Sequence, residues 1–146
     1  MGFAGRVGDT FRFKDKPHNS IWYVILTTPN DTGEVVIVRF VTPIKSIQIY
    51  VRFTSKHDGT LFPKDKTIAY ADAVLRPLEA IIEYANANQD MIWPSCPLDL
   101  IDMAVDGAFQ AGQSSKSVLR QLAKAYPLLA EKYPGLLNMP IKNAGD

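Results

Sequence analysis

The sequence contains a single cysteine, Cys96, and only two histidines, His18 and His57. One cysteine excludes a disulfide framework within the chain, and the scarcity of both residue types excludes the usual cysteine and histidine zinc sites. We expect Cys96 to be a small buried hydrophobic residue near a helix start rather than a nucleophile, because free cysteine is among the most buried residue types.

A long apolar run is also missing. The longest aliphatic and aromatic run, residues 21–26, is too short to span a bilayer. The first residues show no apolar segment of the kind found in signal peptides. Together with the single cysteine, these absences predict a soluble cytoplasmic protein with no membrane partner.

Familiar catalytic and phosphate-binding motifs are absent. Gly2, Gly5 and Gly8 precede a predicted strand rather than a helix, so they do not make a glycine-rich phosphate loop. Neither a G-x-S-x-G elbow nor an H-E-x-x-H zinc motif occurs in the chain. The sequence therefore identifies no reaction through a motif of this kind.

Three aspartates, Asp99, Asp102 and Asp106, would share one face of a predicted helix. No histidine or glutamate joins them at helical spacing. A solvated face whose first carboxylates favour the positive helix N-terminus is therefore a better interpretation than a metal site. Asp9 is interpreted as a turn residue. We expect neither a metal nor a cofactor.

Charge of one sign is not in excess over the whole chain, which carries a net charge of +1. The distribution is uneven. Residues 1–70 hold ten Lys and Arg against six Asp and Glu, whereas residues 71–146 hold six against nine. The first half is therefore mildly basic, which permits a phosphate-binding face there.

The first half of the chain is rich in β-branched and aromatic residues. These fall in runs at residues 10–13, 21–28, 35–42 and 47–55, separated by short polar turns, with a short last run at 67–70. Such runs predict antiparallel strands, and the dense turn at 29–33 predicts a hairpin. Strand 21–28 is nearly all apolar, so we expect it to be covered on both faces.

Residues 47–55 alternate cleanly between apolar and polar side chains. The apolar set should face the core, and it consists of Ile47, Ile49, Val51 and Phe53. The other set should form an exposed row, and it consists of Gln48, Tyr50, Arg52 and Thr54. This row could stack a base and hold a phosphate, or it could be covered by helices or by a second subunit.

From Asp72 the apolar period becomes helical, and Pro77 suits a first helical turn. Residues 86–93 are interpreted as a connection. Ser95 is the expected N-cap of a second helix that ends at Gly112, and Ser114 or Ser115 should cap a third. Residues 128–133 should add a last turn or two, followed by a tail from 136.

The predicted fold class is α+β: a small SH3-like antiparallel β-barrel followed by C-terminal helices. We expect one domain over residues 1–146, with the barrel at 8–70 and a helical extension at 71–146 packed on it. The apolar face of each of these helices has to pack against another element, because short helices are only marginally stable alone in water.

The two histidines lie in predicted loops next to strands. Loop histidines are usually solvated surface residues. A pair of them with a nearby cation is nevertheless what metal-free RNA cleavage requires, with one ring as base, the other as acid, and the cation on the phosphate. The sequence leaves open whether His18 and His57 converge.

Residues 8–11, 18–26 and 35–42 resemble the PemK/MazF-like toxins, which are small SH3-like barrels of bacterial toxin–antitoxin systems. The shared features are a Gly-Asp start to the first strand, an apolar second strand, an Asn/Gly turn and a third strand ending in threonine, here Thr42. The resemblance implies RNA cleavage, an antitoxin partner and a dimer. The family places an arginine just before the second strand, where this chain has His18, Asn19 and Ser20.

Two hypotheses follow. In the first, the protein is a toxin-like, metal-independent endoribonuclease that acts on single-stranded RNA. Its catalytic residues would be His18, His57, Arg52 and Thr42, and its substrate-binding residues Gln48, Tyr50 and Thr54. In the second, it is a non-catalytic SH3-like module that binds nucleic acid or protein, with the helices forming a partner or dimer surface.

Overall fold

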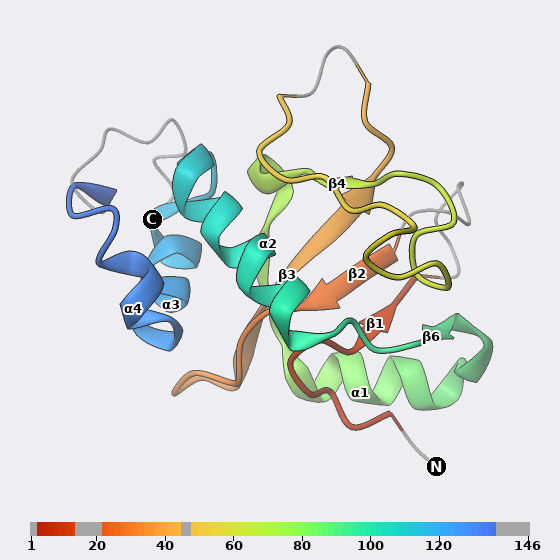
Figure 1. Ribbon diagram of the computed structural model, residues 1–146. Coiled ribbons are helices and arrows are strands. Elements are labelled where there is room, and N and C mark those ends of the chain that lie inside the picture. The colour runs from red at the N-terminus through yellow and green to blue at the C-terminus, as the bar shows by residue number, and fades with distance from the viewer. Residues whose placement is uncertain (1–2, 14–21, 45–47, 137–146) are drawn as a thin grey trace.

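The computed structural model describes residues 3–13, 22–44 and 48–136, and Figure 1 shows how its elements are arranged. Six strands form one antiparallel sheet with the order β4-β3-β2-β1-β6, and β5 also pairs with β3. The strands are β1 (Thr10–Phe11), β2 (Trp22–Ile25), β3 (Glu34–Val41), β4 (Thr67–Ile68), β5 (Val74–Pro77) and β6 (Ile92–Trp93).

The four α-helices follow or flank the later strands. They are α1 (Leu78–Ala87), α2 (Leu98–Ala111), α3 (Lys116–Ala125) and α4 (Pro127–Ala130), with short 3-10 turns η1 (Tyr70–Asp72) and η2 (Gln89–Met91). An antiparallel sheet followed by C-terminal helices confirms the α+β class. The relation to SH3-like barrels stays a prediction. No helix within the described residues is long and apolar enough to cross a membrane.

The hairpin of β2 and β3 is confirmed. Val24 pairs with Val38 and Ile25 with Ile37, as expected for two runs of β-branched residues. The turn between the strands is closed by Asn30, whose side-chain oxygen accepts hydrogen bonds from the backbone N–H of Thr32 and of Glu34. This is the local bonding through which asparagine favours turns.

The sheet is covered on both faces, as the apolar second run predicts. One face carries a large cluster that includes Val24, Val38 and Phe40. The other face carries a smaller cluster with Ile25, Ile37 and Ile81 of α1. Successive residues of a strand point to opposite faces, so β2 and β3 supply both clusters.

Helices α2 and α3 pack on the sheet. Ile101 and Val105 of α2 and Leu122 of α3 are buried in the same cluster as the sheet residue Val38. Figure 1 shows α1 below the sheet in that view, with α2 to α4 together on its other flank. Gly112 ends α2 in the left-handed conformation, and the Ser115 side chain caps α3, both as expected.

The strand predicted over residues 47–55 is wrong. Within its described part, only Phe53 pairs with another segment, through an isolated antiparallel bridge to Lys66, and Ile49 is exposed. The edge of β3 that faces away from β2 is already occupied by β4 and β5. The described part of this segment therefore cannot pair with β3 there. The segment therefore contributes buried side chains, Val51 and Phe53, rather than a strand.

The predicted boundary between strands and helices at residue 70 is also wrong. Strands β5 and β6 come from the segment assigned to helices, and α1 begins at Leu78 rather than near Asp72. Pro77 explains the late start, because a proline biases the residue before it, Arg76, toward extended backbone. Likewise Ser95 does not cap α2: its hydroxyl donates to Asp9 Oδ1 at 2.9 Å, and Pro97 holds the N-cap position.

Candidate functional site

The predicted catalytic pair is only half within the described residues. His18 lies outside them. His57 is exposed on a turn after Phe53, where its Nδ1 accepts a hydrogen bond from the backbone N–H of Thr54 at 3.1 Å. Since Nδ1 is the acceptor, the proton of the neutral ring is assigned to Nε2.

Arg52 and Thr42 lie near the same backbone pairing as His57. The bridge between Phe53 and Lys66 is made by two backbone hydrogen bonds of 2.8 and 2.9 Å. Arg52 forms an ion pair with Asp65 at 3.2 Å, and the Thr42 hydroxyl accepts a hydrogen bond from Lys66 Nζ at 3.3 Å. The structure thus brings together four of the predicted site residues around segments 52–57 and 65–66. They are Thr42, Arg52, Thr54 and His57.

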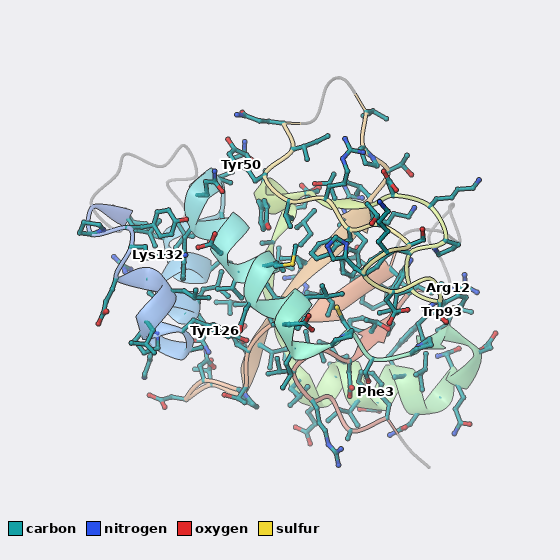
Figure 2. The ribbon with its side chains drawn as sticks, viewed as in Figure 1. Phe3, Arg12, Tyr50, Trp93, Tyr126 and Lys132 are labelled. Carbon is teal, nitrogen blue, oxygen red and sulfur yellow. The ribbon has the colours of Figure 1, made fainter. Side chains whose placement is uncertain are left out.

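Gln48 and Tyr50 do not join them in one exposed row. Tyr50 is half-buried, and its ring packs edge-on against Tyr70 with centroids 6.4 Å apart. Gln48 lines a different hollow, with Arg39 and Asp72. Figure 2 shows Tyr50 well apart from Arg12 and Trp93. The row predicted from alternation does not exist because its strand does not form.

A hollow of about 460 Å³ opens at the sheet edge where β6 lies. We call it the Trp22/Trp93 pocket, and it is lined by Arg12, Trp22, Thr60, Leu61, Pro63, Lys64, Lys66 and Trp93. Its volume falls within the range of pockets that hold small organic ligands. None of these described lining residues is acidic, and three are cationic.

One wall of the pocket is built by three neighbouring strands. Trp22 starts β2, Arg12 follows β1, and Trp93 ends β6. The pairing of β1 with both neighbours brings the two indoles to a centroid separation of 5.9 Å. The guanidinium of Arg12 lies over the Trp93 ring, with Cζ 5.2 Å from its centroid, which is a cation–π contact. Figure 2 shows these two residues side by side.

The facing wall comes from residues 60–66. Phe62 anchors this wall by stacking on Trp22 from inside the core, at 6.3 Å between centroids. Lys66 is 9% exposed, and its pKa is lowered, first by burial and then by repulsion from Lys64. Lys64 and Lys66 both line the pocket, so their positive charges favour an anion there.

The two tryptophans differ in how much surface they offer. Trp22 is 6% exposed and belongs to the large core cluster, whereas Trp93 is 38% exposed. Trp22 therefore lines the bottom of the pocket and also stabilises the fold. The Trp93 ring is exposed enough for a ligand to pack on it. An exposed aromatic ring beside several cations is a pairing found in sites for anionic aromatic ligands.

The pocket residues were not found from the sequence. Trp22 falls in the apolar strand predicted over 21–28, and Trp93 falls in the connection predicted over 86–93. The pairing of β6 with β1 joins residues far apart in the chain, so no local pattern predicts it. The closely spaced lysines in the segment Phe62-Pro63-Lys64-Asp65-Lys66 were the one local indication.

Cys96 is buried, as expected, and burial raises the pKa of its thiol to about 12. Such a thiol carries little thiolate near neutral pH and is a poor nucleophile. In the aspartate row, Asp106 accepts hydrogen bonds from Lys132 and Tyr133, while Asp99 and Asp102 are exposed. No group of three or more metal-ligating side chains is placed to hold an ion in the part of the chain that the structure describes.

No protein-family model, curated protein or solved structure matches this chain. The resemblance to the PemK/MazF-like toxins therefore stays a prediction.

Proposed function

We propose that this protein binds single-stranded RNA, with a nucleobase packed against the indoles of the Trp22/Trp93 pocket and a phosphate held by Lys64 and Lys66. The observation that carries the proposal is the joint placement of an exposed indole and three cations around one hollow. RNA supplies a flat aromatic base and an anion in each repeating unit, which matches both halves of this lining.

Base stacking and phosphate binding contribute to the affinity of single-strand sites in different ways. Base–aromatic stacking contributes about 1–3 kcal/mol per base. Each phosphate neutralised on a single strand adds about 0.7 to the slope of log affinity against log salt. A pocket lined by one exposed indole and two lysines should therefore bind a single nucleotide weakly, and bind RNA more strongly when several nucleotides are engaged.

Binding is favoured over cleavage as the primary activity. Neither His57 nor Arg52 lines the Trp22/Trp93 pocket, and Arg52 is already paired with Asp65. General acid–base cleavage requires its proton-transfer groups within hydrogen-bond reach of the substrate. The second hypothesis, a non-catalytic module, is therefore the one supported, and the endoribonuclease stays a prediction.

This proposal does not change the predictions about partners, oligomeric state and location. An antitoxin or another protein partner, a homodimer and a cytoplasmic location all stay predictions. A cytoplasmic location is consistent with the one cysteine of the chain being a buried free thiol.

The test is a fluorescence-anisotropy titration of a labelled single-stranded RNA heptamer at several salt concentrations. Trp93→Ala should weaken binding by about 5- to 150-fold, corresponding to the loss of one stacked base. Lys64→Met should weaken binding and lower the salt slope by about 0.7.

The matched control is Lys124→Met, which removes the same charge from an exposed position on α3. It should leave both affinity and salt slope near the wild-type values. Absence of binding at low salt, or equal effects of the Lys64 and Lys124 variants, would contradict the proposal. A DNA heptamer of the same sequence separates RNA binding from general single-strand binding.

A further inference from the structure

We propose that Trp93 is shared by two base sites, and that the second site, a hollow that also contains Asp9, selects guanine. This inference rests on the proposed function. A second hollow of about 280 Å³ shares Trp93 with the first. We call it the Asp9 pocket, and it is lined by Phe3, Ala4, Arg6, Asp9, Ile92, Trp93 and Ser95.

The two hollows differ in charge and therefore in the part of RNA that suits them. The Trp22/Trp93 pocket has three cations and no acid among its described lining residues, so it suits a phosphate. The Asp9 pocket has one arginine and one aspartate, so its formal charges cancel. A site without excess positive charge has little attraction for phosphate, and its polar groups are left to recognise a base.

The carboxylate of Asp9 is held in a fixed orientation. Oδ2 accepts a hydrogen bond from the backbone N–H of Arg6 at 2.9 Å, and Oδ1 accepts one from the Ser95 hydroxyl at 2.9 Å. The first bond lies within the N-terminal segment, and the second joins that segment to the one after β6. An ionised carboxylate has about four acceptor positions, so each oxygen can accept one further hydrogen bond.

The backbone next to Asp9 makes this arrangement rigid. Gly8 donates to Ile25 at 2.8 Å, and its own carbonyl accepts from Cys96 at 2.7 Å. Gly8 has a φ of +93°, and a Cβ there would lie 2.6 Å from the Cys96 carbonyl oxygen. Only glycine fits this approach, which keeps Asp9 and Ser95 within hydrogen-bond distance.

A carboxylate with one free acceptor position on each oxygen matches a base edge with two adjacent N–H donors. Guanine has such an edge, formed by N1–H and the N2 amino group. Adenine and cytosine each pair one amino donor with a ring acceptor, and the single N–H of uracil lies between two carbonyls. The apolar wall of Phe3, Ile92 and Trp93 supplies the stacking surface that a base in this pocket requires.

The shared indole places the two sites in sequence along one strand. Successive bases of a single strand pack on successive aromatic surfaces in sites of this kind. One nucleotide would hold its phosphate on Lys64 and Lys66, and its neighbour would present a guanine to Asp9. The recognition element is therefore a guanosine beside any second nucleotide.

The experiment compares four RNA heptamers by anisotropy. Three contain uridine with guanosine, adenosine or inosine at the central position, and the fourth is all uridine. Wild-type protein should bind the guanosine heptamer about 5- to 150-fold more tightly than the uridine or adenosine heptamer, the range for one bidentate base contact. Inosine, which lacks the N2 amino group, should lose most of this preference.

Asp9→Asn should abolish the guanosine preference, so that the guanosine and uridine heptamers bind this variant with equal affinity. Lys64→Met should weaken all four heptamers by the same factor. The inosine comparison needs no variant, so it tests the inference even if Asp9→Asn fails to fold. Equal binding of guanosine, inosine and uridine heptamers would overturn the guanine site but leave the proposed function intact, whereas absence of binding to all four would refute the proposed function itself.

Discussion

The hydroxyl of Tyr70 donates a hydrogen bond of 2.7 Å to the carbonyl of Ala104, and it occupies the space that a side chain at Gly107 would need. A Cβ at Gly107 would lie 2.1 Å from the Tyr70 hydroxyl oxygen and 3.0 Å from Cζ. Tyr70, in the turn after β4, therefore packs directly on α2. This contact joins the sheet to the helix that packs across it.

The first prediction concerns this contact. Gly107→Ala should reduce the free energy of unfolding by up to about 2 kcal/mol, because overpacking costs about 1–3 kcal/mol and the gain in helix propensity returns only about 1 kcal/mol. Urea denaturation measures the change. Gly135→Ala is the control, since nothing lies within 4 Å of its added Cβ, and it should change stability by less than about 0.5 kcal/mol.

A double-mutant cycle tests the cause of that loss. Tyr70→Phe removes the hydroxyl oxygen and with it the 2.1 Å approach, leaving the milder 3.0 Å contact with the ring. Gly107→Ala should therefore cost at least about 0.5 kcal/mol less in the Tyr70→Phe background than in the wild type. Strictly additive effects would show that the glycine is required for another reason.

The second prediction is a loss of stability at alkaline pH. Burial raises the pKa of Cys96 from 9.0 to about 12, and burial raises the pKa of Tyr126 from 10.0 to about 12. A raised folded-state pKa means that the native protein binds the proton more tightly than the unfolded chain. The stability from these groups is full below pH 9 and is lost progressively as the pH rises toward 12.

Thermal melting from pH 7 to 11 measures this effect. The melting temperature should fall above about pH 9, and Cys96→Ala should flatten the first part of the fall, because alanine has no proton to lose. The two curves should run parallel below pH 8, where both proteins carry the same charges at this position. A variant curve that stays parallel to the wild type throughout would contradict the role of the thiol.

Local patterns predicted the parts of this fold that are determined locally. The hairpin of β2 and β3, the end of α2 at Gly112 and the cap at Ser115 depend on neighbouring residues, and all were predictable. The alternation of residues 47–55 correctly marked Val51 and Phe53 as buried. It could not show that the edge of β3 would be taken by β4 and β5 instead.

The candidate site was beyond sequence reasoning for the same physical reason. Trp93 meets Arg12 because β6 pairs with β1 across most of the chain length, and no spacing in the sequence encodes that pairing. Arg52 and His57 stood out as residue types, but their partners are local: Asp65 for Arg52 and the Thr54 backbone for His57. Residue type alone suggested Arg52 and His57 as candidate site residues. The long-range pairing of strands determines which side chains line the same pocket.

The third prediction separates stability from binding at Lys66. Its lowered pKa means that burial disfavours the charged side chain in the folded state. This cost is present below the folded pKa and is relieved as the pH rises toward the ordinary value of 10.5. Lys66→Met should therefore leave stability at pH 7 equal to or above the wild type, while RNA affinity falls.

Denaturation and anisotropy on the same preparation check both halves of this prediction. Lys64→Met is the matched comparison, because Lys64 is exposed and should change stability by less than about 0.5 kcal/mol while also weakening binding. If Lys66→Met lost stability and kept full RNA affinity, Lys66 would be a structural residue rather than part of the binding site.

The last prediction addresses cleavage. We expect the protein to bind single-stranded RNA without cutting it, because the described candidates for proton transfer and for phosphate binding in cleavage are engaged outside the Trp22/Trp93 pocket. Nδ1 of His57 accepts from the Thr54 backbone, and Arg52 is paired with Asp65. A fluorogenic RNA incubated with the protein in EDTA should remain intact at concentrations where anisotropy shows that it is bound.

The nuclease hypothesis predicts a different outcome in the same assay. Cleavage would continue in EDTA, and His18→Ala or His57→Ala would each slow it by about 10²–10⁴-fold, the usual contribution of one general acid or base. Arg52→Gln would slow it as well by removing the phosphate clamp. Lys124→Met serves as the control for a lost surface charge. EDTA-resistant cleavage that these three variants suppress and the control retains would overturn the assignment of a purely binding module, because it would mean that the histidines and Arg52 reach the RNA backbone once the strand is bound.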